Sequence, residues 1–156
     1  MRVDHSAYSE KIPQALNKYE TGWTATYGPL ELIKEDIIAF AKMVDPQPLH
    51  TDEAFAKTTR FGGLIASALH PYSEFHKRFW VPLTAETFIC GLSFDHAMFT
   101  QPVYAQQPIY ARLTIVDAKA KYDKDVVIVK WEWWILNDKL EMIHTLRNST
   151  LHKLMK

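Results

Sequence analysis

The sequence lacks several features that would point to particular protein classes. Cys90 is the single cysteine, which excludes an intramolecular disulfide and a cysteine-rich metal cluster. Eighteen basic and eighteen acidic residues cancel, so no net charge would draw the chain to nucleic acid or to an anionic membrane. No stretch approaches the roughly 18 apolar residues of a membrane-spanning helix, and the first residues contain no apolar signal-peptide core. We therefore expect a cytoplasmic protein with neither nucleic-acid nor membrane partners.

The composition is that of a folded domain. Hydrophobic residues make up 47% of the chain and charged residues 23%, a balance typical of globular proteins. No repeat, low-complexity tract or linker divides the sequence, and 156 residues is a usual size for one domain with a sizeable core. We interpret residues 1–156 as a single domain, and we expect Cys90 to be one of its small core residues.

The first part of the chain shows a strand pattern followed by a helix pattern. Alternation of apolar side chains from Tyr19 to Tyr27 predicts a half-buried strand that the following Gly-Pro pair ends. Residues 33–44 then place apolar side chains on one face of a helix. Because a proline disfavours helical backbone in the residue before it, this helix is predicted to stop near Asp45.

Two further helices are predicted before the middle of the chain. Thr51 can cap a short helix that runs over residues 51–59. Residues 64–80 predict a long, mostly apolar helix, in which Pro71 removes one backbone hydrogen bond and should cause a kink or a restart.

The second half of the chain is predicted to form strands. The segments are residues 92–105, residues 108–121, and a hairpin over residues 126–154 that turns at Asn137 and Asp138. Five apolar side chains alternate along one face of the hairpin's first strand, while Val126, Ile128 and Trp134 make the other face too apolar for full exposure. A second subunit that covers an edge and a face of a wide antiparallel sheet would bury them.

The stretch "VDPQPLHTD", Val44 to Asp52, is the strongest candidate for chemistry. It carries Asp45 and His50 on a segment that Pro46 and Pro48 are expected to hold out of any helix. A bend that brought both side chains to one pocket would make them an acid and base pair. Without such a bend, the same residues would only close a turn between two helices.

The longer segment "FAKMVDPQPLHTDEAFAKTTRFGGLIASALH", Phe40 to His70, resembles the signature of the MaoC-like dehydratase family, which includes the (R)-specific enoyl-CoA hydratases. A weaker similarity continues in "LSFDHAMFTQPVYAQQPIYARL". The resemblance implies an α+β hot-dog fold, in which a curved antiparallel sheet wraps a long central helix and two such units form a homodimer or a higher oligomer. It implies a role in fatty acid metabolism, with acyl-CoA or acyl-carrier thioesters as substrates and no cofactor apart from the CoA of the substrate.

The same resemblance implies roles for individual residues. Asp45 and His50 match the catalytic pair that activates water in the reversible hydration of an enoyl thioester. The backbone N–H of Ala68 matches the group that polarises the thioester carbonyl. Four further positions are implied to bind substrate: Gln47, Gly63, Ser67 and His76.

The chain departs from the family pattern at three residues. Ala68 stands where glycine is common, Gln47 stands where asparagine is usual, and Pro71 lies next to the proposed carbonyl site. Two alternatives to a hydratase therefore stay open. One is an acyl-CoA thioesterase on the same fold, and the other is a non-catalytic, acyl-thioester-binding subunit of a hetero-oligomer.

Other polar residues are weaker candidates. His70 and His76 are six positions apart, which does not suit two ligands on one helix face, so we expect no metal site. Three histidines in predicted strands are expected on sheet faces or at a subunit contact: His96, His144 and His152. Four basic residues could meet a CoA phosphate: Lys57, Arg60, Lys77 and Arg78.

Overall fold

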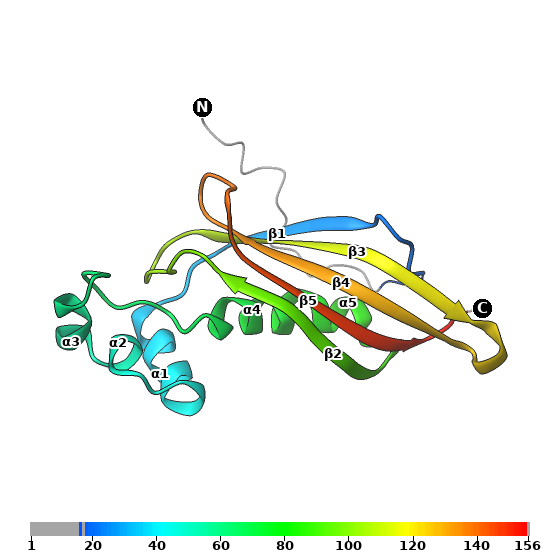
Figure 1. Ribbon diagram of the computed structural model, residues 1–156, viewed down its shortest axis with the longest axis horizontal. Helices are drawn as coiled ribbons and strands as arrows, with labels where there is room; N and C mark the ends of the chain where they lie inside the picture. The colour runs from blue at the N-terminus through cyan, green and yellow to red at the C-terminus, as the bar shows by residue number, and fades with distance from the viewer. Residues whose placement is uncertain (1–15, 17, 156) are drawn as a thin grey trace.

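The computed structural model describes residues 16 and 18–155, and its main feature is a five-stranded antiparallel sheet with the strand order β1-β3-β4-β5-β2 (Figure 1). The strands β1 and β2 form the two edges. Short hairpin turns join β3 to β4 and β4 to β5, so these strands pair with their neighbours in the chain. The strands are β1 (Thr24–Leu30), β2 (Phe88–Phe99), β3 (Ile109–Lys121), β4 (Val126–Leu136) and β5 (Met142–Lys153).

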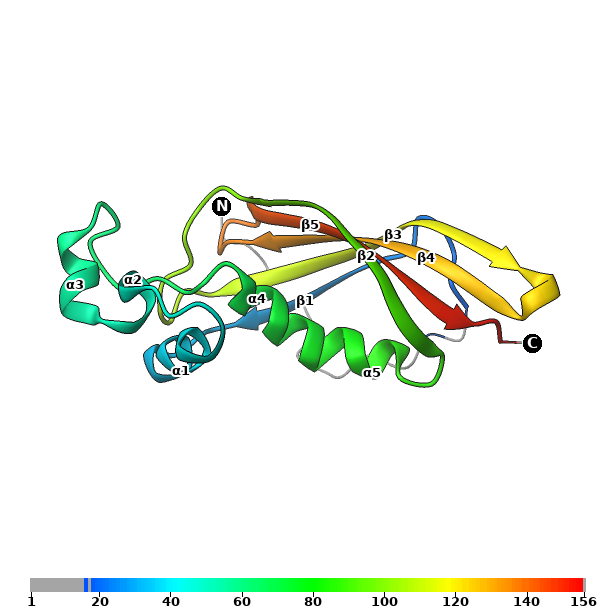
Figure 2. The same cartoon turned by 60° about the horizontal axis from the view of Figure 1, so that its bottom comes forward.

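The helices form two groups. One continuous helix runs beneath the curved sheet and comprises α4, a π-helical turn η2 and α5 (Figure 2). Three short helices gather at one end of the molecule (Figure 1). The bounds are α1 (Lys34–Val44), α2 (Pro48–Thr51), α3 (Glu53–Thr58), α4 (Leu69–Phe75), η2 (His76–Trp80) and α5 (Val81–Thr84), with a 3-10 turn η3 (Tyr122–Lys124) between β3 and β4. Among the described residues, no helix has the length and hydropathy needed to cross a membrane.

The core lies between the central helix and the concave face of the sheet. The alternating residues of β4 all belong to it, as predicted: Val127, Val129, Trp131, Trp133 and Ile135. Phe75 and Phe79 pack against them from the helix. Two tryptophans of β4 also donate hydrogen bonds to side chains of β5. Trp131 Nε1 donates to Thr150 Oγ1 at 2.7 Å, and Trp133 Nε1 donates to Asn148 Oδ1 at 3.0 Å.

The central helix begins later than the sequence pattern predicts. Residues 64–68 are not helical, since Ile65 forms an isolated bridge with Tyr104 and Ala66 N donates to Val103 O at 2.8 Å. The helix starts at Leu69, which places Pro71 in its first turn, where a helix needs no N–H donor. The predicted break at Pro71 is therefore wrong, and the irregularity is the π-helical turn at His76–Trp80.

The segment after α1 also differs from expectation. The helix α1 ends before Asp45, as predicted, but Pro48 begins a helical turn instead of preventing one. Its fixed φ angle suits the first position of a helix. Asp52, rather than Thr51, caps the next helix, because its Oδ1 accepts a hydrogen bond from Phe55 N at 3.0 Å.

Two sequence predictions about the sheet are corrected. The first strand begins at Thr24 and continues across Gly28 to Leu30, with a register shift where the Gly-Pro pair was expected to end it. Gly28 has a φ of +129°, and a Cβ there would lie 2.8 Å from Ile109 O, so glycine is required. Cys90 is exposed on the edge strand β2 instead of buried in the core.

Candidate active site

Asp45 and His50 come together because the chain turns twice between them. The N–H of Asp45 donates to Ala41 O at 2.8 Å and ends α1, and the N–H of Gln47 donates back to Asp45 O at 2.8 Å. The helical turn of α2 then rotates His50 towards Asp45. As a result, His50 Nε2 lies 3.4 Å from Asp45 Oδ2. The bend that the acid and base hypothesis requires is therefore present, and a short helix provides it.

The tautomer of His50 follows from its second nitrogen. His50 Nδ1 lies 2.7 Å from Ile65 O, and a carbonyl oxygen can only accept, so Nδ1 carries a hydrogen and donates it. In the neutral ring, Nε2 then presents a lone pair towards Asp45. Two acceptors that face each other across 3.4 Å can share one proton, or can bind one donor such as a water molecule.

Ser67 contacts the same carboxylate oxygen that faces His50. Its Oγ donates to Asp45 Oδ2 at 2.8 Å, and its side chain is almost completely buried. Ser67 belongs to the irregular segment that precedes α4, two residues after Ile65. One short segment therefore orients both members of the pair, through a backbone carbonyl for His50 and a hydroxyl for Asp45.

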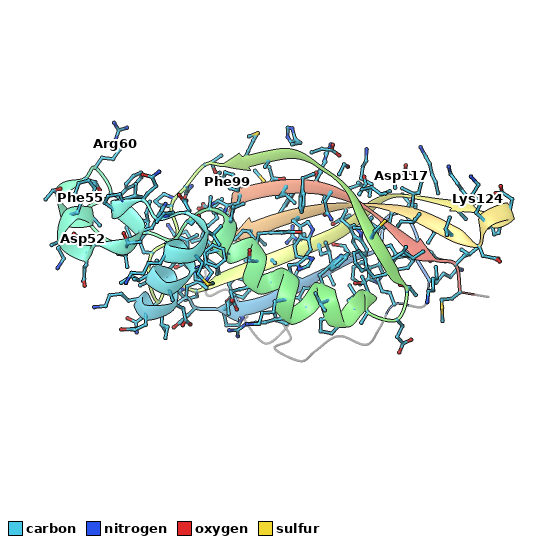
Figure 3. The ribbon with its side chains drawn as sticks, turned by 90° about the horizontal axis from the view of Figure 1, so that it is seen from below. Asp52, Phe55, Arg60, Phe99, Asp117 and Lys124 are labelled. Carbon is cyan, nitrogen blue, oxygen red and sulfur yellow. The ribbon has the colours of Figure 1, made fainter. Side chains whose placement is uncertain are left out.

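The pair opens onto a cavity of about 400 Å³. The side chain of Asp45 is 34% exposed and that of His50 is 10% exposed, so the cavity is accessible while the imidazole is shielded from bulk solvent. The opposite wall comes from the end of β2, from the loop after it and from β5. It consists of Phe99, Thr100, Gln101, Pro102, Val103 and His144. Figure 3 shows Phe99 at the end of β2 that is nearer to the helices α1–α3, far from Asp117 and Lys124.

The structure gathers four of the predicted site residues and leaves three apart. Ala68, the residue before α4, lines the same cavity as Asp45 and His50, and Ser67 contacts Asp45 directly. At a helix start the backbone N–H groups have no partner within the helix, so the N–H of Ala68 belongs to the set that can bind an acceptor. Three predicted substrate-binding residues are not part of the cavity wall: Gln47, Gly63 and His76.

Each of these three residues lies elsewhere in the structure. Gln47 is exposed at the start of α2, where its carbonyl oxygen accepts from His50 N at 2.9 Å. Gly63 lies in the connection from α3 to α4, and a Cβ there would meet no atom within 4 Å. His76 stacks on Trp80 at a centroid distance of 4.6 Å.

His144 is a residue of the cavity that sequence reasoning did not link to the site. It lies on a strand of the sheet, β5, as expected, and it is buried and lines the cavity. Its Nε2 lies 2.9 Å from Gln101 O, and burial lowers the pKa of its imidazole. The weaker sequence similarity over residues 92–113 included the loop that contacts it, but no local signal marked His144 itself.

Two of the four basic candidates are paired with carboxylates. Lys57 Nζ lies 3.8 Å from Glu53 Oε1, and Arg78 Nε lies 3.0 Å from Glu74 Oε2, so both cations are paired on their own helices. Arg60 extends from the end of the molecule that holds α3 (Figure 3). Within residues 16 and 18–155, no group of three or more His, Cys, Asp or Glu side chains is placed to hold a metal ion.

Comparison with known proteins identifies the family. The family model described as the MaoC like domain matches residues 12–132. The chain belongs to the MaoC-like dehydratase family. A relative, the uncharacterized protein YdeM of Bacillus subtilis, is 30% identical over 108 residues, which cover 68% of this chain and 76% of YdeM.

Two solved structures share the fold. A structure named as a monoamine oxidase regulatory protein from Archaeoglobus has a TM-score of 0.77 at 26% identity, and the match covers 92% of this chain and 96% of that one. The (R)-hydratase of A. caviae involved in PHA biosynthesis has a TM-score of 0.65 at 22% identity, with coverage of 89% and 99%. The fold is thus the hot-dog fold that the sequence resemblance implies, with a five-stranded antiparallel sheet around a central helix.

Proposed function

We propose that this MaoC-like protein is a hydro-lyase that adds water to the C2=C3 bond of an enoyl thioester and removes it in reverse. The acyl group is carried on CoA or on a carrier protein, and no other cofactor takes part. The observation that carries the proposal is the pairing of Asp45 and His50 at 3.4 Å on the wall of a cavity of about 400 Å³. Membership of the dehydratase family and structural similarity to (R)-hydratases support it.

The chemistry follows from two facing acceptors. A water molecule held by His50 Nε2 and the Asp45 carboxylate loses a proton to this pair while its oxygen bonds to C3. The electrons of the C2=C3 bond move towards the thioester carbonyl, and C2 then takes a proton back from the pair. Acid and base catalysis of this kind contributes about 10²- to 10⁴-fold in rate.

The thioester carbonyl needs a hydrogen-bond donor while negative charge develops on its oxygen. We assign this role to the backbone N–H of Ala68, which lies on the cavity at the start of the central helix. An alanine retains the N–H that a glycine would provide. The Ser67 hydroxyl positions Asp45 and has no direct part in proton transfer.

We further propose that two chains associate through β2. This strand lies at the edge of the sheet, and all of its residues are exposed in a single chain. Its exposed side chains are largely apolar: Phe88, Ile89, Leu92, Phe94, Met98 and Phe99. An apolar edge strand of this length is a ready surface for pairing with a second copy.

The experiment that tests the function follows the loss of conjugated thioester absorbance when crotonyl-CoA or longer trans-2-enoyl-CoAs are added. Asp45→Asn and His50→Asn should each lower kcat by at least 100-fold. The second substitution retains an amide donor for Ile65 O while it removes Nε2. Matched controls are Asp36→Asn on the exposed face of α1 and Lys124→Asn in η3, which should leave the rate unchanged.

The same assay separates the alternatives. Unchanged rates in both site variants would remove the pair from the mechanism. Release of free CoA, detected with a thiol reagent, would instead indicate a thioesterase. Binding of acyl-CoA without either reaction would indicate the acyl-thioester-binding subunit, a reading that Ala68 in the place of glycine favours.

A further inference from the structure

His70 is a buried side chain near the site that the proposed chemistry does not use. It lies in the first turn of α4, two residues after Ala68, and only 2% of it is exposed. Its ring stacks on the ring of Phe40, with the centroids 4.3 Å apart and the two planes inclined by 2°. Phe40 belongs to α1 and lies five residues before Asp45. The stack therefore joins α1 to the start of α4, which lie side by side in Figure 2.

Packing, rather than hydrogen bonding, accounts for the burial of this ring. Among the residues that the structure describes, His70 Nδ1 has no hydrogen-bond partner. Burial lowers the pKa of the imidazole, so the ring that faces Phe40 is neutral at pH 7. A neutral imidazole that lies flat on a phenyl ring acts as an aromatic side chain, and stacked aromatic pairs stabilise a contact beyond the area that they bury.

The proposed reaction needs groups from both of these helix ends in a fixed arrangement. Asp45 directly follows α1, and Ala68, whose N–H is assigned to the thioester carbonyl, directly precedes α4. The hydrogen bond from Ser67 Oγ to Asp45 Oδ2 at 2.8 Å spans the two ends at one point. The flat contact between the rings adds a second point, so the two contacts together restrict both the distance and the angle between the helices. A displacement of reacting groups by about 1 Å can lower a rate about 10²-fold.

We infer that His70 is a positioning residue, whose stack on Phe40 holds the carboxylate of Asp45 in the arrangement with the N–H of Ala68 that hydration requires. The inference rests on the proposed function, because it takes the thioester carbonyl to lie at Ala68 and Asp45 to take part in proton transfer. His70 and Phe40 are not part of the cavity wall. Loss of the stack should therefore lower kcat and leave KM nearly unchanged.

The first test compares variants that remove a ring with a variant that retains it. Phe40→Leu and His70→Leu should each lower kcat for crotonyl-CoA about tenfold, because leucine keeps an apolar side chain but cannot stack. Phe40 is half-buried, so Phe40→Tyr can keep the ring in place and should retain kcat within about twofold. Tyr122→Leu, the loss of an exposed aromatic ring in η3, is the matched control and should leave kcat unchanged.

The double variant separates one shared role from two unrelated structural losses. If both rings act through the stack, Phe40→Leu/His70→Leu should have the kcat of either single variant, because the second substitution has no stack left to remove. Two unrelated losses would multiply to about 100-fold. Urea unfolding of the same proteins gives the folded fraction to which each kcat refers. Calorimetry with butyryl-CoA, which has no double bond to hydrate, should give Kd values within about twofold of one another.

The outcomes separate this inference from the proposed function. Hydration by the original protein with an unchanged kcat in both leucine variants would overturn the inference and leave the hydratase proposal standing. A multiplied loss in the double variant, or a raised KM with an unchanged kcat, would also overturn the inference alone. An original protein that hydrates no enoyl-CoA would overturn the proposed function and, with it, the role of the stack in catalysis.

Discussion

Acidification from pH 7 to pH 4 should remove about 3 kcal/mol from the free energy of unfolding through one buried histidine, His152. This residue lies at the opposite end of β5 from the cavity, and none of it is exposed. Burial lowers the pKa of its imidazole from 6.5 to about 4. The surroundings are aromatic, with Trp80 and Phe88 in edge contact with the ring.

The hydrogen-bond partners of His152 are neutral hydroxyl groups. Its Nε2 lies 2.7 Å from Thr150 Oγ1, which also accepts from Trp131 Nε1. Its Nδ1 lies 3.0 Å from Tyr19 OH and 3.2 Å from Thr87 Oγ1. None of these partners is a carboxylate, so none offsets the positive charge that protonation of the buried ring creates.

The sign of the effect follows from the depressed pKa. Between pH 6.5 and pH 4 the unfolded chain binds a proton at His152 and the folded chain does not, so stability is complete above pH 6.5 and falls as the pH approaches 4. At 1.36 kcal/mol per pKa unit, the difference between a pKa of 6.5 and a pKa of about 4 gives about 3 kcal/mol. Other buried histidines, such as His70 and His144, have lowered pKa values and add to the slope in the same direction.

Urea unfolding at a series of pH values, followed by tryptophan fluorescence, measures this contribution. His152→Asn should be less stable than the original protein at pH 7. Between pH 7 and pH 4, its free energy of unfolding should decrease by about 3 kcal/mol less than that of the original protein. Lys124→Asn, at an exposed position of η3, should leave the slope unchanged. If His152→Asn and the original protein lost stability in parallel between pH 6.5 and pH 4, the argument from burial would be refuted.

Three further substitutions test other parts of the structure. Ser67→Ala should lower kcat about tenfold and leave KM nearly unchanged, because it removes the bond that orients Asp45, while Ser73→Ala on α4 should have no effect; a raised KM alone would show a substrate contact instead. Gly28→Ala should cost about 2 to 4 kcal/mol in urea unfolding, and an unchanged midpoint would contradict the close contact at its backbone. Asp52→Ala should cost about 1 kcal/mol as a lost helix cap, which equal stability would disprove.

Local patterns predicted the parts of the fold that local physics decides. The alternation along β4 was sufficient to assign its core face, since every second side chain of a strand points to the same side. The end of α1 at Asp45 followed from the proline after it. Asp45 and His50 are near neighbours in the chain, so a bend between them was a reasonable hypothesis before the structure showed its geometry.

Two outcomes could not be predicted from local sequence patterns. Thr51 and Asp52 are both good helix caps, and the additional helical turn α2 selected the second. The position of His144 depends on the pairing of β5 with β2, where Phe99 lies opposite it beyond a register shift between Asp95 and Met98. Such a shift has no local sequence signal, and it determines which side chains of β2 reach the cavity.

The wrong prediction for the start of the central helix and the geometry of the site have the same cause. In a helix that began at residue 64, the carbonyl of Ile65 would accept from the N–H of Leu69 and would not be available to His50. The bridge of Ile65 to Tyr104 and the bond from Ala66 N to Val103 O hold this segment extended instead. The Ile65 carbonyl is then free to fix the tautomer of His50, and Ser67 reaches Asp45. The pairing of residues 65–66 with residues 103–104 therefore positions both groups of the proposed acid and base pair, and it does so through backbone groups.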